Sequence, residues 1–153
     1  MGAVAATLVN GAPADPPETD RRLLDWLRAD RGITSVKEGC GAGHCGACTV
    51  LRDGRPVLSC CVYTAQVVGS EIVTAEGVAG TVLGRRLVDE LVARGAMQCG
   101  YCTPGMVVAA FAALSGRAGG LVEAEARAAL TGNVCRCTGY APIVEAMLAV
   151  SGG

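Results

Sequence analysis

Lysine, aromatic residues and long apolar runs are scarce in this chain of 153 residues. Lys37 is the only lysine beside 12 arginines, and the formal net charge is −1, so no basic footprint for nucleic acid or an anionic membrane exists. Aromatic residues make up only 3 %, and a core must therefore be built largely from Ala, Val and Leu. The longest nearly uniform apolar segment, Met106–Leu114, is much shorter than the roughly 20 residues of a spanning helix. These absences predict a protein that binds neither nucleic acid nor membrane.

Cysteine, by contrast, is abundant. The first residues lack the charged start and apolar stretch of a secretory signal, so we expect a cytoplasmic protein. In a reducing compartment, clustered cysteines bind metal or do chemistry more often than they form disulfides. The nine cysteines fall into two groups, within residues 40–61 and 99–137, separated by 37 residues. This division suggests two sites on two modules.

The first half of the chain carries strand and hairpin signals. Asn10-Gly11 and Asp53-Gly54 are typical two-residue hairpin turns between short apolar runs. The strands expected around them and beyond are residues 4–9, 49–52, 56–59 and 72–75. A helix capped by Thr19 or Asp20 should pack its leucines across these strands. We expect residues 1–76 to form a small α+β domain.

The second half reads as helical. After a linker at Glu76–Gly80, apolar residues recur at helical spacing. Thr103 is a suitable N-cap, with Pro104 at the first helical position. The helices expected here are residues 81–94, 106–114, 122–130 and 143–150. The pattern predicts a second, all-α domain over residues 81–153.

The first cysteine group has the spacing of a plant-type [2Fe–2S] site. This cluster type uses the pattern C-x4-C-x2-C…C, which is matched by Cys40, Cys45, Cys48 and Cys60. Four of the eight residues 39–46 are glycine, which lets the backbone wrap closely and point N–H groups at anionic sulfurs. The neighbouring Cys61 would point to the opposite face of a strand from Cys60. We therefore expect Cys61 to be a small buried hydrophobic residue.

The second cysteine group fits two kinds of metal site. Its members are Cys99, Cys102, Cys135 and Cys137. Zinc held by four cysteines is a common structural site, and this group alone does not distinguish zinc from iron–sulfur. The plant-type loop in the same chain favours iron–sulfur. The two groups together predict two [2Fe–2S] clusters with eight thiolate ligands.

Three segments, Gly39–Val50, Gln98–Met106 and Gly132–Tyr140, resemble the signatures of the small iron–sulfur subunit of the molybdenum hydroxylase (xanthine oxidase) family. The resemblance covers nearly the whole chain, with the segments in the expected order. It implies an N-terminal β-grasp (plant-type ferredoxin-like) domain followed by an all-α four-helix bundle, each holding one cluster. His44 stands where relatives often have Gln or Glu, and it is expected to be a loop or interface residue.

The resemblance also implies partners and a role. The expected partners are a large molybdopterin-binding subunit and a medium FAD-binding subunit, in a dimer of heterotrimers. By motif position, Gln98 and Cys137 would contact the pterin. The chain would then be an oxidoreductase subunit with no catalytic residue or substrate site of its own, relaying electrons from molybdenum through the helical-domain cluster and the ferredoxin-domain cluster to FAD. The alternative is a stand-alone two-cluster ferredoxin-type carrier.

Overall fold

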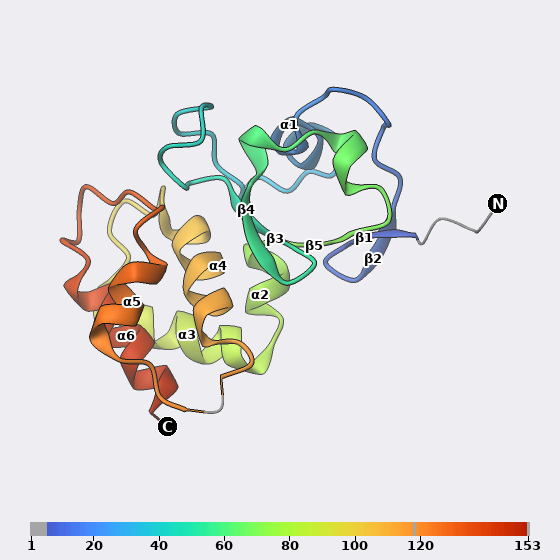
Figure 1. Cartoon of the computed structure of the whole chain (residues 1–153). Coiled ribbons are helices and arrows are strands. Elements are labelled where there is room, and N and C mark those ends of the chain that lie inside the picture. The colour runs from blue at the N-terminus through green and yellow to red at the C-terminus, as the bar shows by residue number, and fades with distance from the viewer. Residues whose placement is uncertain (1–5, 118, 153) are drawn as a thin grey trace.

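The N-terminal half is a five-stranded mixed sheet crossed by one helix. A computed structural model describes residues 6–117 and 119–152 (Figure 1), so positions 4 and 5 of the expected first strand lie outside the described residues. The sheet order is β2-β1-β5-β3-β4, in which β1 runs parallel to β5 and the other pairs are antiparallel. The strands are β1 (Thr7–Val9), β2 (Ala12–Ala14), β3 (Thr49–Arg52), β4 (Arg55–Leu58) and β5 (Glu71–Val73).

Both predicted hairpin turns are present. Asn10 and Gly11 have φ of 51° and 79°, and Asp53 and Gly54 have φ of 50° and 76°. Positive φ at both central residues is the requirement of the tight turn whose twist matches that of paired strands. These turns set the registers of β1 against β2 and of β3 against β4.

The helix α1 (Leu23–Ala29) covers one face of the sheet and supplies its core. The expected cap at Thr19 or Asp20 is wrong, because α1 begins after Arg22. The preceding residues are held extended instead: Thr64 N–H donates to the carbonyl of Arg21, and Arg22 forms a β-bridge with Tyr63. The buried side chains of the helix are Leu23, Leu24, Trp26 and Leu27. Trp26 therefore packs in the core of this half.

The C-terminal half is helical, as predicted. Its helices are α3 (Val82–Ala93), α4 (Thr103–Leu114), α5 (Glu123–Ala129) and α6 (Ala141–Ser151). The expected linker at Glu76–Gly80 is mostly a further short helix, α2 (Ala75–Ala79), whose Val78 is fully buried. The N-cap of α4 is Cys102, one residue before the expected Thr103. Among the described residues, every helix is too short or too polar to cross a membrane.

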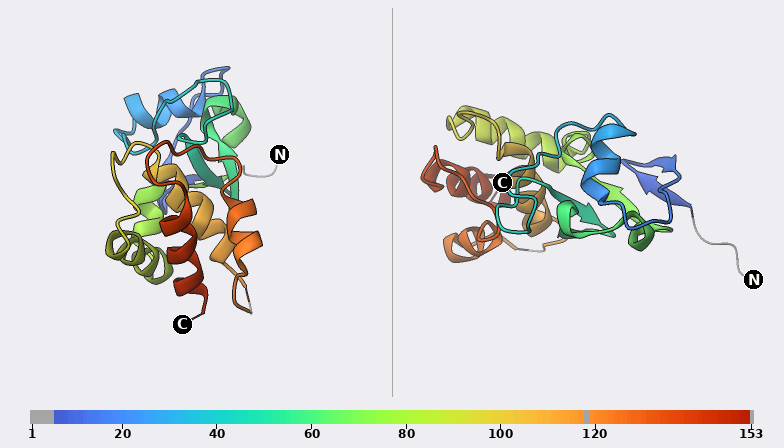
Figure 2. Two further views of the ribbon diagram at one scale, coloured as in Figure 1. Left: turned by 90° about the vertical axis from the view of Figure 1, so that its left-hand side faces the viewer. Right: turned by 90° about the horizontal axis from the view of Figure 1, so that it is seen from above.

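The two halves share buried surface. Helix α4 lies against β3 and β4 (Figures 1 and 2), and Leu51 of β3 belongs to the same buried apolar cluster as the helices. The cysteine-bearing loops, residues 39–48, 95–102 and 131–140, gather at one end of the molecule (Figure 1). The fold therefore brings together segments about 90 residues apart in sequence, as the contact of Gly46 with Asn133 illustrates.

Candidate metal centres

The exposed end of the first cysteine group is an anion-binding loop. The main-chain N–H groups of Ala42 and His44 donate to Sγ of Cys40 over 3.4 and 3.2 Å. These two donors, with the N–H of Cys45, lower the pKa of Cys40 to about 6. Because a thiolate is the form that binds metal, these donors favour the form of Cys40 that could hold a metal.

Glycines let this loop pack closely against its own cysteine side chains and against the loop that carries Gly132. A Cβ at Gly39 would lie 2.6 Å from Sγ of Cys45. Gly43 and Gly46 have φ of +78° and +70°, values that side-chain-bearing residues rarely adopt. A Cβ at Gly46 would lie 2.3 Å from the carbonyl oxygen of Gly132. A side chain at these positions would therefore either clash with a neighbouring atom or strain a backbone with positive φ.

The inner end of the group is formed by Cys48 and Cys60, which are both buried. Burial raises the pKa of Cys48 to about 11, and the adjacent thiol of Cys60 contributes to the shift. Metal binding at Cys48 therefore has to release a proton. This pair is the water-shielded part of the first cysteine group, whereas Cys40 is exposed.

The prediction for Cys61 is wrong. Ser59–Cys61 is a 3₁₀ helix and not a strand, so consecutive side chains diverge by about 120° instead of alternating across a sheet. Cys61 is exposed, and its Sγ lies 3.6 Å from Sγ of Cys60. Five thiols, not four, therefore surround the first site.

The second cysteine group lies at the start of α4 and in the loop before α6. The thiols approach one another in two pairs, Cys102 with Cys135 and Cys99 with Cys137. Burial, with the neighbouring thiol of Cys135, raises the pKa of Cys102 to about 12. Burial also acts on Cys135, but hydrogen bonds led by the Thr138 hydroxyl, 3.2 Å from its Sγ, give a lowered pKa.

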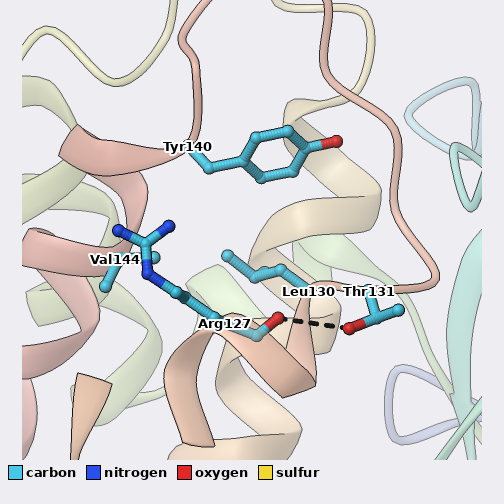
Figure 3. Close-up of a pocket in the computed structure, with 5 residues that line it drawn as sticks. All are labelled: Arg127, Leu130, Thr131, Tyr140 and Val144. Carbon is cyan, nitrogen blue, oxygen red and sulfur yellow. Dashed lines mark hydrogen bonds between the residues drawn. The ribbon is translucent and has the colours of Figure 1, made fainter. Parts of the chain in front are cut away.

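Tyr140 organises the loop that carries Cys135 and Cys137. Its hydroxyl accepts the N–H of Cys135 over 2.8 Å and donates to the carbonyl of Asn133 over 3.0 Å. Its backbone has φ of 68°, and its N–H donates to Oγ1 of Thr138 over 3.1 Å. The ring of Tyr140 also walls a cavity of about 150 Å³ (Figure 3), together with Arg127, Leu130, Thr131 and Val144. Sequence analysis assigned Tyr140 no role.

The two ligand loops are hydrogen-bonded to each other. Val134 N–H donates to the carbonyl of Cys45 over 2.9 Å. The buried Asn133 donates through Nδ2 to the carbonyl of Gly46 over 2.9 Å and to Oγ1 of Thr49 over 3.3 Å. No local sequence pattern around Asn133 shows that its amide reaches a loop 87 residues away.

The donor set fits iron–sulfur chemistry. Each of the two groups offers four sulfur ligands, gathered in pairs. Among residues 6–117 and 119–152, three or more Cys, His, Asp or Glu side chains do not converge as a single-ion site. A binuclear [2Fe–2S] cluster takes two thiolates for each iron, which is the pairwise arrangement seen.

The residues expected to face the pterin lie at the surface. Gln98 is exposed immediately before Cys99, and Cys137 is exposed in the facing loop. His44 is exposed as well, and only its main-chain N–H reaches a cysteine sulfur.

Two protein-family models match the chain and together span residues 9–148. The family described as "2Fe-2S iron-sulfur cluster binding domain" matches residues 9–72. The family described as "[2Fe-2S] binding domain" matches residues 74–148. Each match contains one of the two cysteine groups.

Three similar proteins are matched over most of their own length. The nicotinate dehydrogenase small FeS subunit of Eubacterium barkeri is 49 % identical over 130 residues, covering 85 % of this chain and 82 % of that protein. The xanthine dehydrogenase iron-sulfur-binding subunit of Escherichia coli O157:H7 is 42 % identical over 141 residues, covering 92 % and 89 %. A chain of the crystal structure of quinoline 2-oxidoreductase from Pseudomonas putida 86 superposes with a TM-score of 0.84 at 37 % identity, covering 96 % and 92 %.

Proposed function

Because this chain belongs to the family of small iron–sulfur subunits of molybdenum hydroxylases, we propose that it is the electron-transfer subunit of a molybdopterin-dependent hydroxylase or dehydrogenase. The observation that carries the proposal is the presence of two four-thiol groups, one in each half, whose loops at residues 39–48 and 131–140 hydrogen-bond to each other. The catalytic site belongs to larger partner subunits.

We assign one cluster to each half of the chain. Residues 1–76 would hold the first, through Cys40, Cys45, Cys48 and Cys60. Residues 81–153 would hold the second, through Cys99, Cys102, Cys135 and Cys137. The lowered pKa of Cys40, the glycine-rich loop and the paired thiols support this ligand set.

When bound, the two clusters supply one-electron carriers between the molybdenum centre of one partner and FAD of another. The chain's own residues hold ligands in place and exclude water from the inner thiols. Backbone N–H groups neutralise charge on Cys40, and burial shields Cys48 and Cys60. The hydroxyl of Tyr140 fixes the main chain at Cys135.

We further propose the partners and the contact surface. The large molybdopterin-binding subunit would meet the end of the molecule where Gln98 and Cys137 are exposed, and these two residues would contact the pterin. A medium FAD-binding subunit would complete a heterotrimer, and two heterotrimers would pair. None of the nine cysteines forms a disulfide, and we propose that the complex lies in the reducing cytoplasm.

Size-exclusion chromatography of the native protein, with metal analysis of the eluted peak, tests this function. The expected result is co-elution with larger, molybdenum-containing subunits and about four iron atoms for each copy of this chain, two for each [2Fe–2S] cluster. Elution of the iron-loaded chain alone would support the stand-alone carrier instead. Zinc in place of iron would reject both readings.

A further inference from the structure

The fifth thiol of the first site is placed to act as a ligand. We propose that Cys61 is a reserve ligand of the first cluster, which takes the place of Cys60 when the Cys60 thiolate is lost. The inference rests on the proposed function, because it presumes a [2Fe–2S] cluster held by the first cysteine group. It adds a residue that the four-cysteine spacing does not include.

The local backbone puts both neighbouring thiols on the side of the cluster loop. The 3₁₀ helix Ser59–Cys61 brings Sγ of Cys61 to 3.6 Å from Sγ of Cys60. Two cysteine sulfurs that bind one tetrahedral iron lie at a comparable separation, since each Fe–S bond is about 2.3 Å, as for zinc thiolates. The Cys61 sulfur therefore has to move only 3.6 Å to reach the position of its neighbour's sulfur.

The Cys61 sulfur lies against the glycine-rich loop at Gly43. A Cβ added at Gly43 would be only 2.8 Å from Sγ of Cys61. Gly43 stands between Cys40 and Cys45, in the loop whose N–H groups point at the cysteine sulfur. The Cys61 thiol thus rests against the segment that wraps the cluster, and the small size of Gly43 leaves room for it.

Burial explains why Cys60, and not Cys61, would bind the cluster when both thiols are present. Cys60 is 7 % exposed and packs with the 3 % exposed Cys48, whereas Cys61 is exposed. Ligation by Cys60 keeps the inner iron shielded from water. Ligation by Cys61 would preserve four thiolates and leave that iron more accessible.

The exchange changes no oxidation state. The iron–sulfur bond to Cys60 breaks, an iron–sulfur bond to Cys61 forms, and the proton of the Cys61 thiol passes to solvent. The released Cys60 thiolate takes up a proton. When residue 60 has no thiol, the bond to Cys61 forms directly during cluster assembly.

The test compares alanine variants of the full-length chain by iron content and visible absorption. Cys60→Ala is expected to keep both clusters, with about four iron atoms per chain. Cys60→Ala with Cys61→Ala should hold only the second cluster, so the iron content falls by half. Cys61→Ala alone should match the wild type. Cys48→Ala is the matched control, because it is also a buried ligand but is flanked by Ala47 and Thr49, and it should lose the first cluster.

The second cluster in each variant reports that the chain has folded. Loss of the first cluster in Cys60→Ala, with the second retained, would overturn the proposal, as would retention of the first cluster in the double variant. If Cys60→Ala also loses the second cluster, the chain has not folded, and the nearly isosteric Cys60→Ser is used instead. The first cluster should then be kept in Cys60→Ser and lost when Cys61→Ala is added, and any other result would overturn the proposal. Failure of the proposed function is separate, since it appears in the wild-type chain as zinc or as half the expected iron.

Discussion

The main-chain N–H of Val134 donates to the carbonyl oxygen of Cys45 over 2.9 Å, so a main-chain hydrogen bond joins two of the cysteine-bearing loops. Val134 directly precedes Cys135, and Cys45 belongs to the first group. The route from one set of thiols to the other therefore consists of two short main-chain segments and a single hydrogen bond. Such a connection suits a protein whose two redox sites act in series.

The amide of Asn133 should stabilise this connection measurably. Asn133→Ala removes two buried hydrogen bonds between the ligand loops, at a residue that is 5 % exposed. We expect a loss of about 1–3 kcal/mol in the free energy of unfolding, measured by denaturant titration. Val134→Ala is the control, because its exposed side chain can be shortened while its main-chain donor is kept. Equal stability of the two variants would contradict the assigned role.

Gly46 should tolerate no side chain. Gly46→Ala combines a φ of +70° with a Cβ placed 2.3 Å from the carbonyl oxygen of Gly132. Gly54→Ala has a similar φ of +76° but meets nothing within 4 Å. Backbone strain alone should therefore lower the free energy of unfolding of the Gly54 variant by about 1–3 kcal/mol. The free energy of unfolding of the Gly46 variant should fall further, and this variant should hold less iron in the first cluster. Thermal unfolding and iron analysis check this difference, and similar losses in both variants would refute it.

Tyr140→Phe should weaken the second cluster selectively. The substitution keeps the ring and removes the hydroxyl that joins Cys135 and Asn133. The N–H of Cys135 and the carbonyl of Asn133, both partly buried, are then left unpaired. We expect this to lower the stability of the folded loop by about 1–3 kcal/mol. We expect faster loss of the second cluster to an iron chelator, followed by visible absorption. The first cluster serves as the internal control, and an unchanged rate for the second would argue against the hydroxyl's role.

Gln98→Ala tests the proposed pterin contact. In the assembled complex, we expect normal iron content and cluster spectra, because Gln98 contributes no thiol, but weaker retention of molybdopterin or slower cluster reduction by substrate. Without the Gln98 amide, its polar partner on the pterin would be left unpaired, which would weaken pterin binding by about 1–3 kcal/mol. Rapid-mixing reduction and molybdenum analysis measure the effect. Gln66→Ala is the control, since the exposed Gln66 lies in the N-terminal half and only caps a local turn. Wild-type values for Gln98→Ala would leave it an ordinary surface residue.

The features that sequence analysis predicted correctly are governed by short-range chemistry. Asn10-Gly11 and Asp53-Gly54 form the expected turns because both positions require positive φ. The four C-terminal helices follow from apolar spacing and were placed within a few residues. The relatives and the family models confirm the two [2Fe–2S] modules that cysteine spacing and motif resemblance indicated.

The features that were missed depend on contacts distant in sequence or on a change of backbone type. Cys61 was misplaced because one 3₁₀ helix replaces the end of a strand. Asn133 and Tyr140 draw their roles from partners that only the folded loops bring near. The start of α1 moved to Leu23 because Arg22 pairs with Tyr63, and no local cap signal could have shown this.

The burial of Leu51 among the helices has a kinetic consequence. Leu51 of β3 is buried in the apolar core of the helical half, so the two halves share a core. Two modules joined only by a linker can move relative to each other, and the shared core prevents this motion. The separation between the two redox sites is thereby a constant of the fold, and no swinging motion is needed to bring donor and acceptor together. Because tunnelling rates fall steeply with distance, transfer within the chain is set by this fixed spacing.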